Sequence, residues 1–169
     1  MKQKKTTRQI NVYTTRGALI AALYVVLTML ATALGLSSSA IQFRFSEALC
    51  ILPIFYPEAI PGLVVGCFLS NLLSGCNIWD VIFGSVATLI GAIGAAYLRE
   101  LPEKLKWVCT LPTIIANMVI VPFVLMYAYG ITDSYWFLAA TVGIGEIVCA
   151  GIGGTALYYL IKKTNIHRL

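Results

Sequence analysis

The sequence predicts an all-α membrane protein, built as a compact bundle of six transmembrane helices with the N- and C-termini in the cytoplasm. Of the 169 residues, 59% are hydrophobic and only 11% are charged, whereas soluble domains carry about one quarter charged residues. The charges also fall in clusters that leave long uncharged intervals between them. An interval of about 20 apolar residues is long enough for a helix to cross a bilayer.

Five intervals approach or exceed this length. All are free of charged side chains except the last, which contains Glu146. We predict one membrane-spanning helix in each of these intervals, which comprise residues 17–43, 59–79, 81–98, 107–132 and 134–161.

The sixth predicted helix is a short apolar segment at residues 45–60. Its uncharged part lies between Glu47 and Glu58, and ten α-helical residues rise only about 15 Å, well short of a bilayer. Charge placement nevertheless favours a crossing. If the segment crosses, every Lys and Arg except Arg44 lies on one side of the membrane. If it does not, the basic loop at 99–106 and the tail both face outward, against the excess of basic residues expected on cytoplasmic loops.

This topology divides the chain into three parts. Residues 1–16 form a basic cytoplasmic segment, residues 17–162 a single six-helix transmembrane domain, and residues 163–169 a cytoplasmic tail. We therefore expect a multi-pass protein of a bacterial-type plasma membrane, surrounded by lipid. The formal net charge of +5 reflects the basic flanks of the spans, and without a continuous basic stripe it predicts no nucleic-acid partner.

Few residues in the sequence are suited to catalysis. The only histidine is His167, in the predicted tail, and the five cysteines show no C-x-x-C spacing for metal or redox chemistry. The chain also lacks the G-x-x-x-x-G-K-[ST] phosphate loop of ATPases. We predict a protein that is not an enzyme, with no cofactor and no metal site.

Small residues four apart mark helix faces that approach another helix closely in lipid. The first span offers two rival registers, Gly17 with Ala21 and Ala18 with Ala22, and such a face either packs within the chain or docks a partner. Further stripes of small residues occur in later spans and predict a compact bundle: Gly62, Gly66, Ser70 and Ser74; Gly84, Thr88, Ala92 and Ala96; Gly145, Cys149 and Gly153.

Polar residues are distributed unevenly along the predicted bundle. Four charged residues lie at or near the outer face and three polar residues lie within spans, namely Arg44, Glu47, Asp80 and Asp133, and Asn71, Asn117 and Glu146.

Glu146 is the strongest candidate, because an ionised, unpaired carboxylate near the bilayer centre costs several kcal/mol and usually marks a functional site. The alternative is an internal hydrogen bond, for example to Asn117. Arg44 and Glu47 are three residues apart, which suits either an ion pair or a solvated surface pair. Asp80 has the alternative role of N-cap for the helix that follows it.

Together these groups predict an outward-facing polar pocket for a flat heteroaromatic solute. A carboxylate accepts two parallel N–H bonds from a guanine-type edge, and a second carboxylate balances a cationic amine. Aromatic side chains would roof the pocket by stacking on the rings. The candidates for this roof are Phe43, Phe45, Trp79 and Trp136.

The segments at 41–49, 57–62, 71–73 and 80–89 resemble the queuosine-precursor transporter family of the QueT type. Members of this family are substrate-binding membrane subunits, called S components, of energy-coupling factor transporters, and have six helices. The resemblance implies a 7-deazaguanine substrate such as 7-aminomethyl-7-deazaguanine, a transmembrane coupling protein and two cytoplasmic ATPases as partners, and docking of the coupling protein at Ala18 and Ala22. The residues expected to bind substrate are Arg44, Glu47, Asn71, Trp79, Asp80, Asn117 and Glu146.

The competing hypothesis is a stand-alone secondary transporter driven by a proton gradient. In that case Glu146 would carry the coupling proton, as acids within membranes do in proton-driven transport. The two halves of the sequence show no inverted repeat of the kind many secondary transporters contain. The energy source separates the two hypotheses, because an S component needs its ATPase partners for net uptake.

Overall fold

The computed structural model describes residues 6–36 and 42–164, and every regular element within these ranges is helical. The prediction of an all-α protein is therefore confirmed. Several basic residues used in the charge argument lie outside the described ranges, namely Lys2, Lys4, Lys5 and Arg168, and so does His167.

Four helical rods are long and apolar enough to cross a membrane: α1 (Thr7–Ala33), α3 with η2 (Ile78–Glu100), η3 with α4 (Glu103–Ala128), and the rod Tyr135–Thr164. Within them, α3 is Ile78–Tyr97, η2 is Leu98–Glu100, η3 is Glu103–Thr110 and α4 is Leu111–Ala128. The last rod joins α5 (Tyr135–Glu146), the π-helical η4 (Ile147–Gly153) and α6 (Gly154–Thr164). Two shorter apolar helices, η1 (Phe45–Ile54) and α2 (Ala59–Leu73), complete the bundle.

Several helix boundaries differ from the predicted spans, and two of them have a clear local cause. Helix α1 begins at Thr7, ahead of the uncharged interval, and the Gln9 side chain accepts a hydrogen bond from the Thr6 amide at 3.0 Å. Helix α2 ends at Leu73, earlier than predicted, because Gly75 adopts a left-handed turn with φ of 69°. Asn77 then caps the start of α3. The uncharged interval does not reveal this turn, because its residues, 74–77, are small or polar but carry no charge.

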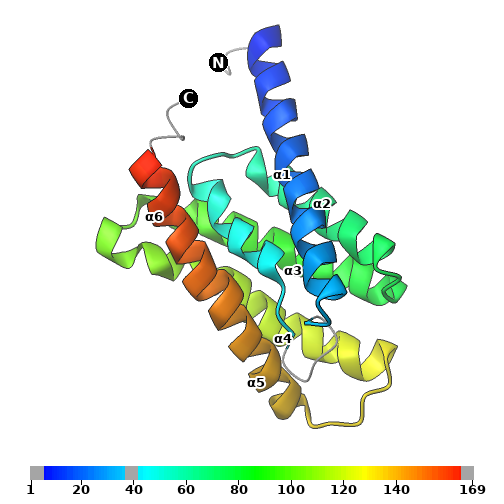
Figure 1. Cartoon of the computed structure of the whole chain (residues 1–169). Helices are drawn as coiled ribbons and strands as arrows, with labels where there is room; N and C mark the ends of the chain where they lie inside the picture. The colour runs from blue at the N-terminus through cyan, green and yellow to red at the C-terminus, as the bar shows by residue number, and fades with distance from the viewer. Residues whose placement is uncertain (1–5, 37–41, 165–169) are drawn as a thin grey trace.

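The start of α1 and the end of α6 lie at the same end of the bundle, which we name the terminal end (Figure 1). The α2–α3 turn and the α4–α5 loop belong to the opposite end, which we name the loop end.

The short segment η1 is a 3₁₀-helix and runs antiparallel to α1. A 3₁₀-helix rises about 2.0 Å per residue, so its 10 residues extend about 20 Å rather than the 15 Å expected for an α-helix. Thr28 of α1 donates a hydrogen bond to Ser46 at 2.8 Å, near the start of η1. Beyond the other end of η1, Glu58 forms an ion pair with Arg16 of α1 at 3.5 Å. The segment thus follows α1 from its loop-end half back toward the terminal end.

Glycines allow two helix pairs to pack at very short range. A Cβ atom on Gly62 of α2 would lie 2.5 Å from the backbone oxygen of Gly17 in α1. A Cβ on Gly91 of α3 would lie 2.4 Å from the Thr113 hydroxyl of α4. Small residues therefore bring α1 against α2 and α3 against α4, as the spacing of small residues predicts.

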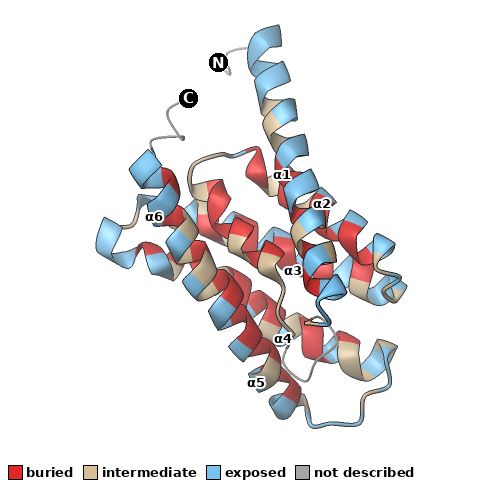
Figure 2. Cartoon of the chain, viewed as in Figure 1, coloured by how far each residue is buried: buried red, intermediate tan, exposed pale blue. Residues whose placement is uncertain are grey.

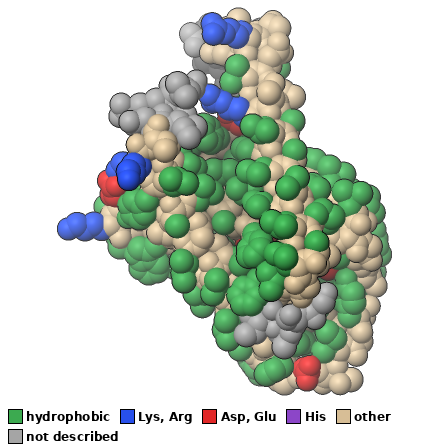
Figure 3. All heavy atoms as spheres, viewed as in Figure 1, with side chains coloured by type: hydrophobic (Ala, Val, Ile, Leu, Met, Phe, Trp, Pro, Cys, Tyr) green, Lys and Arg blue, Asp and Glu red, His purple; other side chains and the backbone are tan. Residues whose placement is uncertain are grey.

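The surface of this bundle differs from that of a water-soluble protein, because large apolar side chains cover much of it. Large apolar side chains such as Leu19, Leu73 and Ile152 are about two-thirds exposed, and exposed residues cover the outward sides of the helices (Figure 2). One face is largely hydrophobic along the middle of the bundle, with Lys and Arg side chains near the terminal end (Figure 3). Continuous apolar surface of this kind suits lipid rather than water.

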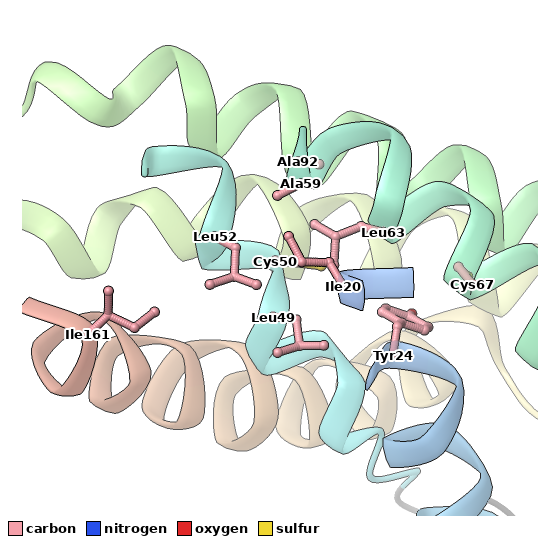
Figure 4. Packing of buried hydrophobic residues seen from close by; sticks show 10 residues of the cluster. All are labelled: Ile20, Tyr24, Leu49, Cys50, Leu52, Ala59, Leu63, Cys67, Ala92 and Ile161. Atoms are coloured by element: carbon pink, nitrogen blue, oxygen red, sulfur yellow. The ribbon is translucent and has the colours of Figure 1, made fainter. Parts of the chain in front are cut away.

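The interior combines apolar packing with buried polar groups. One apolar cluster joins α1, η1 and α2 around Tyr24, Leu49 and Leu63 (Figure 4). Among the fully buried polar residues are Glu47, Asn71 and Asn117. Buried polar residues in lipid-exposed proteins usually serve substrate or ion binding, so they define where to look for a site.

Candidate functional site

A polar cavity of about 340 Å³ opens at the loop end of the bundle, within the size range of small-molecule sites. Its walls come from α1, the segment before η1, the α2–α3 turn, the start of α3 and the end of α4 with its loop. The lining residues are Thr28, Thr32, Gln42, Arg44, Ser74, Gly75, Cys76, Asp80, Leu125, Tyr129 and Ile131.

Arg44 is the cation of this cavity and caps the start of η1. Its Nη2 atom donates a hydrogen bond to Asn71 Oδ1 at 2.8 Å. Asn71 in turn donates to the backbone oxygen of Asp80 at 3.3 Å, and Arg44 lies within electrostatic range of Asp80 and Glu47. The structure thus brings together four of the predicted site residues.

Glu47 lies deeper and is held by neighbours that the sequence did not single out. It is 1% exposed, its Oε1 accepts a hydrogen bond from the Tyr24 hydroxyl at 2.5 Å, and its Oε2 accepts one from the Cys50 thiol at 3.3 Å. Arg44 and Glu47 thus form neither of the pairs considered for them, because Glu47 is buried rather than solvated and, among the described residues, each side chain hydrogen-bonds to its own partners. Tyr24 escaped prediction because a tyrosine in an apolar span also suits ordinary packing.

Glu146 and Asn117 are also buried, at 6% and 2% exposure. Glu146 is the last residue of α5, directly before the π-helical segment η4. It lies within electrostatic range of Glu47 and Arg44, and the Asn117 side chain is its neighbour. Even so, Glu146 Oε2 and Asn117 Nδ2 make no hydrogen bond within the described part of the chain. The internal hydrogen bond to Asn117 that was considered for Glu146 is therefore not formed between these two atoms, although the two side chains lie close enough to interact.

Asp80 contacts the α4–α5 loop rather than capping its own helix. The N-cap of α3 is Asn77, whose side chain accepts a hydrogen bond from the Trp79 amide at 3.1 Å, so the capping role considered for Asp80 is wrong. Asp80 Oδ2 instead accepts a hydrogen bond from the Tyr129 hydroxyl at 3.1 Å. Burial raises the pKa of Tyr129 to about 12, so this hydroxyl keeps its proton and remains a donor at neutral pH.

The sequence of this chain is similar to those of known transporters. A sequence profile described as QueT transporter matches residues 14–163. The chain belongs to the QueT transporter family. A curated relative from Lactococcus lactis subsp. cremoris, described as queuosine precursor transporter QueT, is 35% identical over 108 residues. The match covers 63% of this chain and 60% of the relative, less than two thirds of its length. No solved structure matches.

QueT family membership and the four long apolar helices agree on a multi-pass membrane protein of a transporter family. They confirm the family resemblance seen in the sequence.

In this QueT family member the predicted aromatic roof is not formed by the tryptophans. Trp79 is 55% exposed and stacks on Phe83, with ring centroids 6.0 Å apart. Both line a separate apolar groove between α3 and α4, away from the cavity of Arg44. Trp136 is 79% exposed on α5. Tyr129 supplies an aromatic ring at the polar cavity instead. The two tryptophans are amphipathic side chains of the bundle surface, where such residues often lie at the membrane interface.

The two small-residue registers of α1 have different surroundings. Gly17 meets Gly62, and Ala21 approaches Gly66, so this register packs inside the chain. The neighbouring register, Ala18 and Ala22, is exposed. Of the two registers left open by the sequence, the Gly17 and Ala21 register is therefore the one that packs within the chain.

Proposed function

We propose that this chain is the substrate-binding S component of an energy-coupling factor importer, which captures a queuosine precursor of the 7-deazaguanine type from outside the cell for ATP-driven uptake. The observation that carries the proposal is the polar cavity around Arg44 and Asp80, in which the Arg44 guanidinium lies within electrostatic range of the buried Glu47, in a chain of the QueT family.

The proposal includes six membrane crossings, with η1 and α2 as the two short ones. The terminal end faces the cytoplasm and the loop end faces outward. Support comes from the basic residues Arg8, Arg16, Lys104 and Lys162, which belong to the α1 start, the η2–η3 region and the α6 end, as the excess of basic residues on cytoplasmic loops requires.

Charge balance supports a cationic substrate. Two acidic residues, Glu47 and Asp80, lie within electrostatic range of one guanidinium, that of Arg44. Inside a membrane protein an excess of negative charge is costly, so a bound ammonium group offsets it. The aminomethyl arm of 7-aminomethyl-7-deazaguanine supplies such a group, and the neutral 7-cyano analogue does not.

Calorimetric titration of the purified protein in detergent tests this substrate assignment. We expect 7-aminomethyl-7-deazaguanine to bind at least roughly tenfold more tightly than the 7-cyano analogue, a difference of about 1.4 kcal/mol. Equal affinity for the two would reject the charge argument, and binding of neither would reject the substrate class.

Coupling to ATPases rests on the exposed register of α1. We propose that Ala18 and Ala22 dock the transmembrane coupling protein, because close helix approach needs small residues. Ala22→Trp should therefore abolish uptake in cells that contain the coupling subunits, while the dissociation constant of the substrate stays within twofold. Leu19→Trp is the matched control, since Leu19 is already a large side chain with 67% exposure.

A proton-coupled carrier remains the second candidate because of the deeply buried Glu146. Reconstitution into liposomes decides between the two. Substrate uptake by this chain alone, driven by an imposed proton gradient, would replace the S-component proposal.

A further inference from the structure

Four buried side-chain atoms of the described residues lack a hydrogen-bond partner, and two of them, a donor and an acceptor, belong to neighbouring side chains. Asn117 Nδ2 and Glu146 Oε2 are both buried and lack a hydrogen-bond partner within the described residues. More than 90% of buried polar groups are satisfied in native proteins, and an unsatisfied one costs about 1–3 kcal/mol. A neighbouring donor and acceptor that are both open indicate a ligand group that presents the complementary pair.

The two residues reach the same depth from different helices. Glu146 is the twelfth and last residue of α5, about 18 Å from the loop-end start of that helix. Asn117 precedes Ala128, the loop-end residue of α4, by about 17 Å of helix rise. The π-helical segment η4 begins immediately after Glu146, and π-helical turns frequently occur at functional sites because they displace side chains from the regular helical register.

Other polar groups near this pair already have partners. Both oxygens of Glu47 accept hydrogen bonds, from Tyr24 and from Cys50. The Arg44 guanidinium is engaged by Asn71. Unlike these groups, Asn117 and Glu146 each present a buried atom with no hydrogen-bond partner among the described residues.

We propose that Asn117 and Glu146 form the subsite that reads the lactam edge of the substrate ring. Asn117 Nδ2 donates to the ring carbonyl, and Glu146 Oε2 accepts the adjacent ring N–H. This inference rests on the proposed function and adds to it the residues that recognise the base.

A guanine-type edge fits this pair better than an adenine-type edge. It presents a carbonyl, an N–H and an exocyclic amine in one row, so that a carboxylate accepts two of its N–H groups while the amide donates to the carbonyl. The counterpart with a 6-amino group presents an amine in place of the carbonyl and a bare ring nitrogen in place of the ring N–H, so the Asn117 amide meets a donor and the carboxylate loses one N–H group. With the base oriented inward, the 7-substituent is free to point toward the outer cavity and Asp80.

The test compares two ligands that differ only at this edge, 7-aminomethyl-7-deazaguanine and its counterpart with a 6-amino group in place of the 6-oxo group. Titration calorimetry on the purified full chain gives both dissociation constants. We expect the wild-type protein to prefer the 6-oxo ligand by roughly 100-fold, because a site built for a hydrogen bond rejects an analogue that leaves its polar groups unpaired.

Two variants then assign the preference to the proposed residues. Asn117→Asp should weaken the 6-oxo ligand by roughly tenfold or more and reduce the ratio between the two ligands, because a carboxylate repels the carbonyl and accepts from the amine. Glu146→Gln should also weaken the 6-oxo ligand by roughly tenfold, since it removes the charge from the acceptor. Asn11→Asp and Glu103→Gln, at exposed positions, are the matched controls and should stay within twofold of wild type.

The outcomes separate this inference from the proposed function. If the wild-type protein binds the 6-oxo ligand tightly but neither variant changes its affinity or the ratio, the subsite is elsewhere while the substrate assignment stands. If the wild-type protein binds no deazaguanine, the proposed function fails first. If the variants no longer unfold cooperatively, the test rests on the ratio of the two dissociation constants of the wild-type protein. Equal affinity for the two ligands would then overturn the proposed subsite.

Discussion

Gly84→Ala should separate substrate binding from stability in this protein. Gly84 lies on α3, and a Cβ atom there would stand 2.9 Å from Asn71 Nδ2. The obstacle is the end of a side chain rather than backbone, so the fold can accommodate the methyl group by moving the Asn71 amide. That amide is the partner of the Arg44 guanidinium, so the cost of the change falls on the site.

The expected size of the effect follows from the distances. Ordinary contact begins near 3.4 Å, so the amide has to retreat by about 0.5 Å, a displacement comparable to the usual spread of hydrogen-bond lengths. Displacement along the bond stretches the present 2.8 Å contact to Arg44 beyond the usual upper limit of about 3.2 Å. Hydrogen bonds to charged groups contribute about 1.5–3 kcal/mol, so we expect substrate affinity to fall roughly tenfold or more.

Stability should change little, because Ala is favoured over Gly in a helix by about 1 kcal/mol. The assay is calorimetric titration with 7-aminomethyl-7-deazaguanine, accompanied by thermal unfolding in detergent. Gly151→Ala is the control, since its nearest neighbour would be Ile114 Cδ1 at 3.6 Å, and it should keep wild-type affinity. Wild-type affinity in Gly84→Ala would show that the contact between Asn71 and Arg44 does not support substrate binding.

Two further predictions concern the packing of α1. Gly62→Ala should lower the melting temperature by several degrees relative to wild type, because its Cβ meets the backbone oxygen of Gly17 and overpacking costs about 1–3 kcal/mol; an unchanged or higher melting temperature would contradict close backbone packing there. Tyr24→Phe should destabilise the protein by about 1–3 kcal/mol, because it leaves buried Glu47 without its 2.5 Å partner. Tyr159→Phe, which removes an exposed 3.4 Å contact, should unfold as wild type does, and equal melting temperatures for both Phe variants would show that the buried bond adds no stability.

Much of the fold could be predicted from composition and spacing. Long apolar intervals predicted the helical rods, and small residues four apart predicted close approach at Gly62 and Gly66. The conformation of η1 could not be predicted this way. Hydrophobicity reports that a segment is apolar but not its rise per residue, which depends on how the segment packs among α1, α3, α6 and η4.

The candidate site was predicted in part. Intramembrane polarity singled out Glu146 and Asn117, because the cost of burying such groups in lipid is visible in the sequence. Trp79 was grouped with them but lies in a separate groove, since an amphipathic aromatic residue suits both a pocket and a membrane interface. Tyr24 and Tyr129 were missed because their hydrogen-bond partners come from segments distant along the chain.

The sequence by itself determined that the helices of this protein are surrounded by lipid, roughly how many helical segments there are, and to which family the chain belongs. All three depend on the order of residue types along the chain. Only the tertiary structure decided which small-residue register of α1 is used internally and which carboxylate keeps an open oxygen. Those outcomes depend on how helices rotate against one another, and a rotation is fixed by contacts between segments far apart in sequence.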